Sequence, residues 1–161
     1  MKTTPSTHEE VTELVLLILS VYGDLHSNGL ALTKPFGQSP ARWQLMGELG
    51  RQPLTVSQAA RRIGNTRQSV QRQANEMIKD GLVHYTDNPD HRRSPRVCLT
   101  QKGIEILNRI NKKQVTWATQ IGRRMERRAI KETVWGLRKL AAALRTEESR
   151  LFGGPPPETD S

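Results

Sequence analysis

The chain has 161 residues, enough for one compact domain with long appended helices. Its formal net charge of +9 and its pI near 10.3 indicate a polyanionic partner. The longest uninterrupted apolar run, residues 15–19, is too short to cross a bilayer, and no cleavable signal pattern precedes it. A single cysteine excludes an internal disulfide. We therefore expect a cytoplasmic protein that is neither membrane-spanning nor disulfide-stabilised.

The positive charge is unevenly distributed along the chain. Net charge is −2 for residues 1–50, +6 for 51–103, +7 for 104–150 and −2 for 151–161. Such a basic region gives salt-dependent affinity for phosphates. A membrane surface would attract it too, but no segment combines bulky apolar residues with a dense Lys/Arg face. The charge distribution therefore predicts a partner that carries phosphates and not a membrane surface.

Two helices are predicted in the first third of the chain. Apolar residues recur at three- and four-residue steps over about 8–28, which predicts a helix ending at Asn28-Gly29. Residues 29–38 should then form a loop. A second helix should begin at Ser39-Pro40, because the hydroxyl caps the first turn and proline lacks an N–H where none is needed.

Two short helices separated by a glycine follow. Thr55 and Gln58 form a capping box, and Gly64 is the expected left-handed terminator of the first helix. The second helix is predicted from Thr66 to Asp80. Its outward face is rich in amides and guanidinium groups: Arg67, Gln68, Gln71, Arg72 and Asn75.

A hairpin and two further helices complete the chain. The β-prone runs 83–86 and 96–99 enclose a linker with two prolines, which predicts a hairpin longer than a two-residue turn allows. Apolar spacing then predicts helices over about 101–128 and 130–150. The Gly- and Pro-rich residues 151–161 are expected to be disordered.

Three stretches make the chain similar to the MarR (multiple antibiotic resistance regulator) family of bacterial winged helix-turn-helix transcription factors. They are TVSQAARRIG at 55–64, Gly-Leu-Val at 81–83, and NPDHRRS at 88–94 leading to LTQKG at 99–103. The proline, the arginine pair and the Leu-Thr-x-x-Gly motif are specific at this spacing.

The chain departs from the family pattern at two positions. His91 stands directly before the arginine pair, where the family usually has an aspartate that braces the wing arginine, and the nearest carboxylate is Asp90. Gln73 stands where the family usually has an apolar residue.

The resemblance implies a mainly α fold with a small β-hairpin wing, and a homodimer. It divides the chain into a flexible N-terminus (1–7), a dimerisation helix and loop (8–38), a winged helix-turn-helix domain (39–100), C-terminal dimerisation helices (101–150) and a disordered tail. Two recognition helices would enter successive major grooves of a pseudo-palindromic operator, with half-sites roughly 34–36 Å apart. Most members of the family repress transcription, and many release DNA when a small aromatic or phenolic molecule binds.

The DNA-contacting residues are expected in two groups. Arginine suits guanine, glutamine and asparagine suit adenine, and hydroxyls near a helix start suit phosphate. The alternatives are an ordinary solvated helix face and a charged hairpin that aids solubility. The expected contacts are Thr66, Arg67, Gln68, Ser69, Gln71, Arg72 and Asn75 on the recognition helix, and Arg92, Arg93, Ser94 and Arg96 on the wing.

An effector site is expected on the segments that line the cleft in this family. Aromatic walls with one cation would suit an aromatic carboxylate. Since the chain has only seven aromatic residues, the tryptophans have a second interpretation as core residues. The candidate effector residues are Tyr22, His26, Phe36, Arg42, Trp43 and Trp117.

No cofactor, metal site or enzymatic activity is predicted. The four histidines lack metal-ligand spacing, and Cys98 is interpreted as an inert structural thiol. The arginine cluster at residues 123–128, placed near the end of the long helix, suits a solvated face or dimer ion pairs, with DNA or effector contact as the alternative. The competing function is a sequence-indifferent architectural DNA-binding protein.

Overall fold

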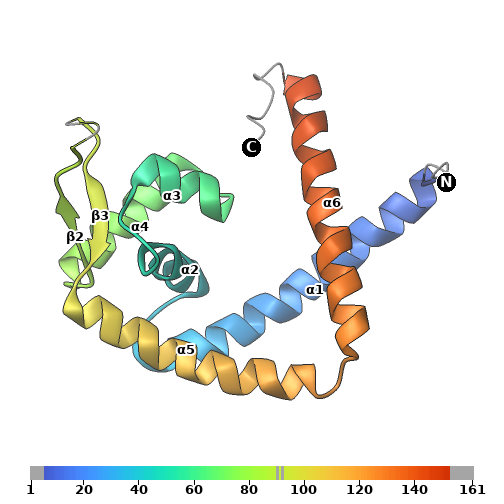
Figure 1. The fold of residues 1–161 in the computed structure, drawn as a ribbon, viewed down its shortest axis with the longest axis horizontal. Helices are drawn as coiled ribbons and strands as arrows, with labels where there is room; N and C mark the ends of the chain where they lie inside the picture. Colours follow the sequence, from blue (N-terminus) through green and yellow to red (C-terminus); the bar gives the residue numbers. More distant parts are fainter. Residues whose placement is uncertain (1–5, 90, 92, 153–161) are drawn as a thin grey trace. The chain divides into compact units, whose positions relative to one another are not determined.

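The computed structural model describes residues 6–89, 91 and 93–152, the last five of these as backbone only. The tail expected to be disordered and the first five residues of the expected flexible N-terminus therefore lie almost entirely outside the described residues. The chain forms two units, residues 1–114 and 115–161. Its elements are α1 (His8–Thr33), η1 (Lys34–Phe36), α2 (Pro40–Leu49), β1 (Leu54–Thr55), α3 (Val56–Ile63), α4 (Arg67–Lys79), β2 (Val83–Thr86), β3 (Arg96–Leu99), α5 (Gln101–Gly122) and α6 (Arg127–Phe152) (Figure 1).

The hydrophobic core lies in the first unit, between α2, α3, α4 and the sheet (Figure 1). Ala59 and Ala60 are buried on α3, where their small side chains allow α3 to approach its neighbours closely. Val70, Ala74 and Met77 form the buried side of α4 at helical spacing. The predicted mainly α fold with a small β wing is confirmed.

The wing belongs to a three-stranded antiparallel sheet with the order β1-β3-β2. Strands β2 and β3 have the predicted bounds. In the register, Val97 of β3 lies opposite Tyr85 on one side and Leu54 on the other. The sequence prediction missed β1, because two residues are too few to show an alternating pattern.

The start of the helix-turn-helix forms as the sequence predicts. The Thr55 Oγ1 accepts from the Gln58 amide nitrogen at 3.2 Å, and the Gln58 Oε1 accepts from the Thr55 amide nitrogen at 2.9 Å. Gly64 adopts φ 65°, the left-handed conformation that ends α3. The Thr66 Oγ1 then caps α4 by accepting from the Ser69 amide nitrogen.

The predicted end of the first helix at Asn28-Gly29 is wrong. The helix continues to Thr33, so the expected loop over 29–38 is also wrong in its first half. The Asn28 Nδ2 donates to the Asp24 carbonyl at 2.8 Å, which keeps the asparagine within the helix. Gly29 is buried, and a Cβ there would lie 3.1 Å from the Pro40 Cγ. This glycine therefore permits close packing of α1 on α2 and does not end the helix.

The predicted boundary between the last two helices is also wrong. α5 ends at Gly122, six residues before the expected position, and α6 begins at Arg127. The Arg124 amide nitrogen donates to the Ile121 carbonyl at 2.9 Å in the intervening turn. The dense arginine cluster consequently occupies the turn and the first positions of α6, and not the end of a long helix.

α1 is exposed on most of its surface. Only Gly29 and Thr33 of its 26 residues are buried. By length and composition, residues 8–36 could cross a membrane: the best window has a mean hydropathy of 1.3, and 6% of it is buried. The sequence prediction considered only the uninterrupted run 15–19, and a core helix of a soluble protein passes the same test of length and composition.

Candidate nucleic-acid interface

The outward face of α4 remains uncovered while its inner face is anchored in the core. At about 100° per residue, Gln68, Arg72, Asn75 and Lys79 point away from the buried side of this helix. All four are exposed. The sequence therefore produces a rigid, polar helix face held from behind by apolar packing.

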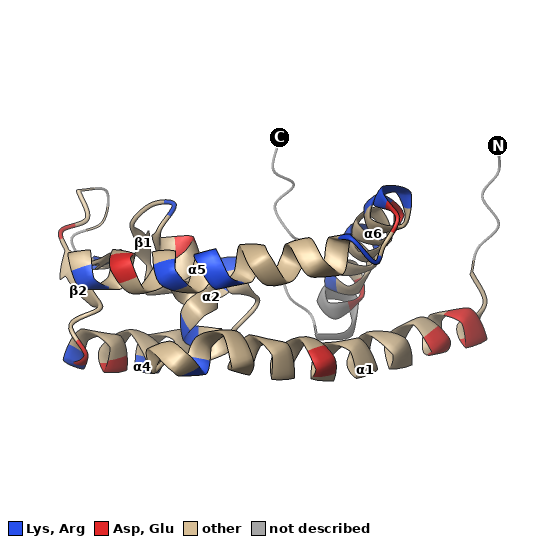
Figure 2. Cartoon of the chain, turned by 90° about the horizontal axis from the view of Figure 1, so that it is seen from below, with Lys and Arg blue, Asp and Glu red and all other residues tan. Residues whose placement is uncertain are grey.

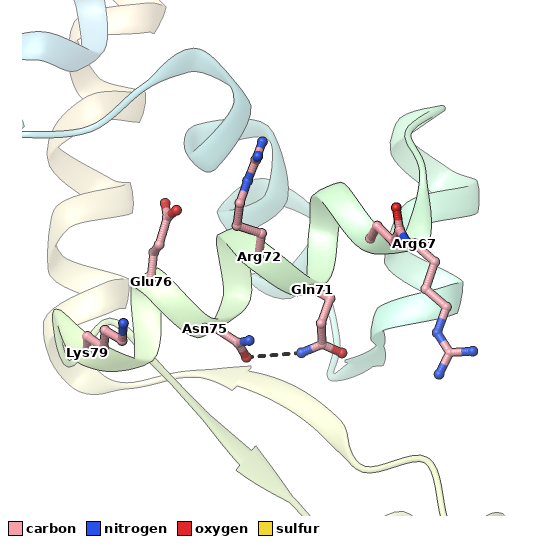
Figure 3. A pocket seen from close by; sticks show the side chains of 7 residues that line it. Arg67, Gln71, Arg72, Asn75, Glu76 and Lys79 are labelled. Atoms are coloured by element: carbon pink, nitrogen blue, oxygen red, sulfur yellow. Dashed lines mark hydrogen bonds between the residues drawn. The ribbon is translucent and has the colours of Figure 1, made fainter.

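A shallow hollow runs along this outward face, and Figure 3 shows its lining. Arg72 and Glu76 project from one flank of α4, while Gln71 and Asn75 lie on the flank facing the wing strands (Figure 3). Glu76 and Lys79 were missed by the sequence analysis, although each follows a predicted contact residue at a four-residue step. The lining residues are Arg67, Gln68, Gln71, Arg72, Asn75, Glu76 and Lys79.

A hydrogen-bonded group connects α4 to the wing. The Gln71 Nε2 donates to the Asn75 Oδ1 at 3.0 Å and to the Tyr85 hydroxyl oxygen at 2.6 Å. Tyr85 lies on β2 and was not among the predicted site residues. A single tyrosine in a short strand carries no sequence signal for such a contact. The orientation of the Gln71 amide is thus set from outside its own helix.

The first turn of α4 contains two hydroxyl groups with internal roles. Thr66 serves as the N-cap, and the Ser69 Oγ accepts from the buried Gln73 Nε2 at 3.4 Å. Gln73 is 8% exposed, and its Oε1 has no hydrogen-bond partner within the described part of the chain. Burying an unpaired amide oxygen reduces stability, so this departure from the family pattern weakens the packing of α4.

The wing linker is held together by Asn88, which sequence reasoning also missed. Its side chain is buried, and its Nδ2 donates to the Ser94 carbonyl at 2.8 Å. The Ser94 amide in turn donates to the His91 carbonyl at 2.9 Å. Asn88 therefore closes the linker at the place where the family's bracing aspartate is replaced by His91.

The predicted wing arginines occupy different environments. Arg93 and Ser94 are exposed, while Arg96 is half-buried on β3. Arg92 and Asp90 lie outside the described residues. The exposed position of Arg93 leaves its guanidinium group accessible to a phosphate backbone.

An ion pair joins α2 to the residue that follows α4. The Arg42 guanidinium on α2 bonds the Asp80 carboxylate directly after α4, and the Lys102 Nζ donates to the Asp80 carbonyl at 2.8 Å. The hydrogen bond from Arg42 and its positive charge hold the pKa of Asp80 below its usual value. This contact ties the end of α4 to both α2 and α5.

The six candidate effector residues are not gathered at one site in a single chain. Arg42 is paired with Asp80, and the Arg109 guanidinium lies 5.0 Å from the centre of the Phe36 ring. The Tyr22 and His26 rings on α1 lie 6.1 Å apart and are tilted by 32°. Trp117 is half-buried in the second unit.

Trp43 lines a separate hollow of about 710 Å³ between α1, α2 and α5. Its Nε1 donates to the Asn111 Oδ1 at 3.1 Å. Glu48 also lines the hollow and is paired with Arg51 at 3.3 Å. Trp43 is therefore the one candidate effector residue that borders this hollow.

The helices differ in the sign of the charges that their side chains carry. α1 contains acidic residues and no Lys or Arg, whereas basic side chains occur along α4, α5 and α6 (Figure 2). No group of three His, Cys, Asp or Glu able to hold a metal is found among the residues searched, which are those the structure describes. Burial raises the pKa of the half-buried Cys98 thiol, more than the nearby Arg96 lowers it.

A helix presented in this way beside a three-stranded wing defines a winged helix-turn-helix DNA-binding protein. A model of the MarR family matches residues 36–94. An uncharacterized protein of Mycobacterium tuberculosis is 36% identical over 139 residues, covering 86% of this chain and 97% of that protein.

Two solved structures share the fold. AbsC, a MarR family transcriptional regulator from Streptomyces coelicolor, has a TM-score of 0.76 at 19% identity, covering 89% of this chain and 99% of AbsC. A mutant MarR from E. coli, complexed with operator DNA, has a TM-score of 0.74 at 15% identity, covering 84% of this chain and 99% of that chain. The chain belongs to the MarR family, whose members are transcriptional regulators and not enzymes.

Proposed function

We propose that the protein is a homodimeric repressor acting in the cytoplasm, which binds a pseudo-palindromic operator through α4 and the wing and is released by a small ligand. The observation that carries this proposal is the outward face of α4. Gln71 is hydrogen-bonded to Asn75 and to Tyr85, and Arg72 and Asn75 are exposed to solvent. Such groups match the hydrogen-bonding edges of guanine and adenine in the major groove.

Dimerisation is supported by the apolar side chains that the single chain leaves exposed. Leu25 on α1 is 53% exposed, and Trp135 on α6 is 66% exposed. Exposed apolar surface of this extent marks an interaction site. A second copy is the favoured occupant because α1 has only acidic charges, whereas α6 has seven Lys or Arg and three Glu. A two-fold dimer would bury both helices and place two copies of α4 about one turn of DNA apart.

Ligand release is supported by the hollow beside Trp43. Its volume of about 710 Å³ suits a small molecule, and it lies between α1 and helix α2 of the DNA-binding domain. Arg42, the cation expected for a carboxylate, is already paired with Asp80. The amides of Asn108 and Asn111 lie at the hollow, together with the Arg51 guanidinium, which is paired with Glu48 at 3.3 Å. We therefore favour a phenolic ligand over an aromatic carboxylate.

Selection of bound sites from random duplex DNA tests the proposal against the architectural alternative. We expect an inverted repeat to be enriched, with an affinity at fixed salt at least roughly 10³-fold above that for scrambled DNA. An architectural protein would give a ratio near one. Phenolic compounds can then be screened for release of the selected site, with a Trp43→Ala variant as the control for the hollow.

A further inference from the structure

The amide pair of Gln71 and Asn75 is oriented by a residue from a different element. The Gln71 Nε2 carries two hydrogens, one of which is donated to the Asn75 Oδ1 and the other to the Tyr85 hydroxyl oxygen. Val83 and Tyr85 share one face of β2 because side chains alternate along a strand. Since Val83 is buried, that face is the one turned toward the core, and it carries the Tyr85 ring to α4.

This arrangement leaves one acceptor and one donor of the pair free. With both hydrogens of the Gln71 amide engaged, its Oε1 is left as an acceptor, and Asn75 keeps the Nδ2 as a donor. Neither atom has a hydrogen-bond partner among the described residues. Because a tyrosine hydroxyl can also donate, turning both amides over would again leave one donor and one acceptor free, so the bond to Tyr85 fixes the position of the Gln71 amide and not its polarity.

The resulting pattern of one acceptor and one donor matches a particular base edge. In the major groove, adenine offers the N6 amino group as donor and N7 as acceptor. The Gln71 Oε1 would accept from N6 while the Asn75 Nδ2 donates to N7. Guanine presents two acceptors on this edge, so the Gln71 oxygen would face the guanine O6 without a hydrogen.

We propose that Tyr85 is a specificity-determining positioning residue, whose hydroxyl holds the Gln71 amide beside Asn75 and thereby supports the preference of the pair for adenine. This inference rests on the proposed sequence-specific binding. It adds which base pair Gln71 and Asn75 recognise. The Tyr85 hydroxyl hydrogen remains available for a phosphate oxygen. That contact alone would strengthen binding to every sequence equally.

The test measures the affinity of the full-length protein for its selected operator and for operators that differ from it by one base pair, all at the same salt concentration. Tyr85→Phe keeps the partly exposed ring and removes only the hydroxyl. We expect discrimination at one A·T pair in each half-site to fall by roughly fivefold or more, since a good base contact contributes about that much or more. Affinity for scrambled DNA should change little. Thr86→Val, which removes the next hydroxyl on β2, is the matched control and should leave every preference unchanged.

A double-variant cycle separates positioning from direct contact. Gln71→Ala should abolish the same preference, and adding Tyr85→Phe to it should change the preference no further. Equal weakening on all sequences by Tyr85→Phe, or an unchanged preference, would overturn the inference. A wild-type protein without any sequence preference would instead overturn the proposed function, so the two failures are distinguishable.

Discussion

The winged domain and the helices that flank it differ in how much of their apolar surface is buried within a single chain. In the winged domain, apolar residues such as Leu45, Met46 and Val70 are at most 1% exposed. On α1 no apolar residue larger than glycine is buried, and on α6 none of the side chains that the structure describes is buried. The first region completes its core within one chain, whereas the second has apolar surface without a covering layer.

This difference assigns separate roles to the two regions. A closed core keeps α4 rigid, so that its polar face can recognise DNA without reorganisation. Open apolar helices supply the free energy of association, since each buried side chain contributes about 1.5–3 kcal/mol. Substitutions in the two regions should therefore be separable: one set should change assembly, and the other should change folding or DNA recognition.

The largest effect is expected on α1. In the combined variant Leu14→Glu, Val21→Glu, two charges occupy the apolar stripe at heptad spacing, and a two-fold dimer contains two copies of each. The dissociation constant of the dimer should rise by at least roughly 10³-fold, because several charges would enter an apolar interface. Sedimentation equilibrium measures this change, and operator affinity should fall with it.

Leu16→Glu is the matched control on the same helix. Leu16 lies on the side of α1 opposite the stripe and is already exposed. The Leu16→Glu variant should remain dimeric. If the double variant also stayed dimeric, α1 would not contribute its stripe to the interface.

At the start of α5, where the helix packs on Leu82 of the winged domain, Gly103→Ala should strongly lower the free energy of unfolding. A Cβ at Gly103 would lie 2.1 Å from the Leu82 carbonyl oxygen, a backbone atom that cannot rotate away. We expect a loss of about 3 kcal/mol in denaturant unfolding, at the upper end of overpacking costs. Gly47→Ala on α2 meets no atom within 4 Å and should gain about 0.5–1 kcal/mol instead. Equal effects of the two substitutions would contradict this packing.

Arg72→Ala should change recognition while leaving assembly intact. Arg72 is exposed on α4 and is not part of the core, so the variant should fold and dimerise normally. Removing one base contact costs about 1–3 kcal/mol of discrimination. Competition between the selected operator and scrambled DNA should show a smaller ratio of operator affinity to scrambled-DNA affinity. A loss of affinity that is equal on both sequences would instead place Arg72 on the phosphate backbone.

Arg93→Ala should weaken binding to all sequences alike. The exposed Arg93 on the wing is positioned for a phosphate contact, which carries no base information. The slope of log K against log salt should become shallower by about 0.9 for each arginine removed from the dimer's contacts. Unchanged affinity at physiological salt for Arg92→Ala, Arg93→Ala together would remove the wing from the interface.

The sequence was sufficient for the local features that single residues control. Thr55, Gln58 and Gly64 act within one turn of helix, and their roles appear as predicted. The face of α4 follows from helical spacing alone. Contacts between distant elements were not predictable, because no local pattern encodes them. Tyr85 and Asn88 are examples, since their partners depend on how β2 and the wing linker fold.

Helix ends were the least predictable feature, and Gly29 shows why. A glycine after asparagine favours a helix end when only local conformation is considered. At this position the absence of a Cβ is used for contact with Pro40, which is a tertiary requirement. Arg42 shows the same limit, because it is paired with Asp80, a residue 38 positions away in the chain.

The smallest effect is expected at the Arg42–Asp80 ion pair, where Asp80→Asn removes the charge from an exposed contact. Because the pKa of Asp80 is lowered in the folded protein, its contribution is complete above the ordinary carboxyl pKa of about 3.9. It is lost as the pH falls through the lowered value. The variant should therefore melt at a slightly lower Tm than the wild type at pH 7, and the two Tm values should converge below about pH 4. Asp87→Asn, at an exposed carboxylate in the same unit, is the control. A difference in Tm that persisted into strong acid would show that Asp80 acts through its shape and not through its charge.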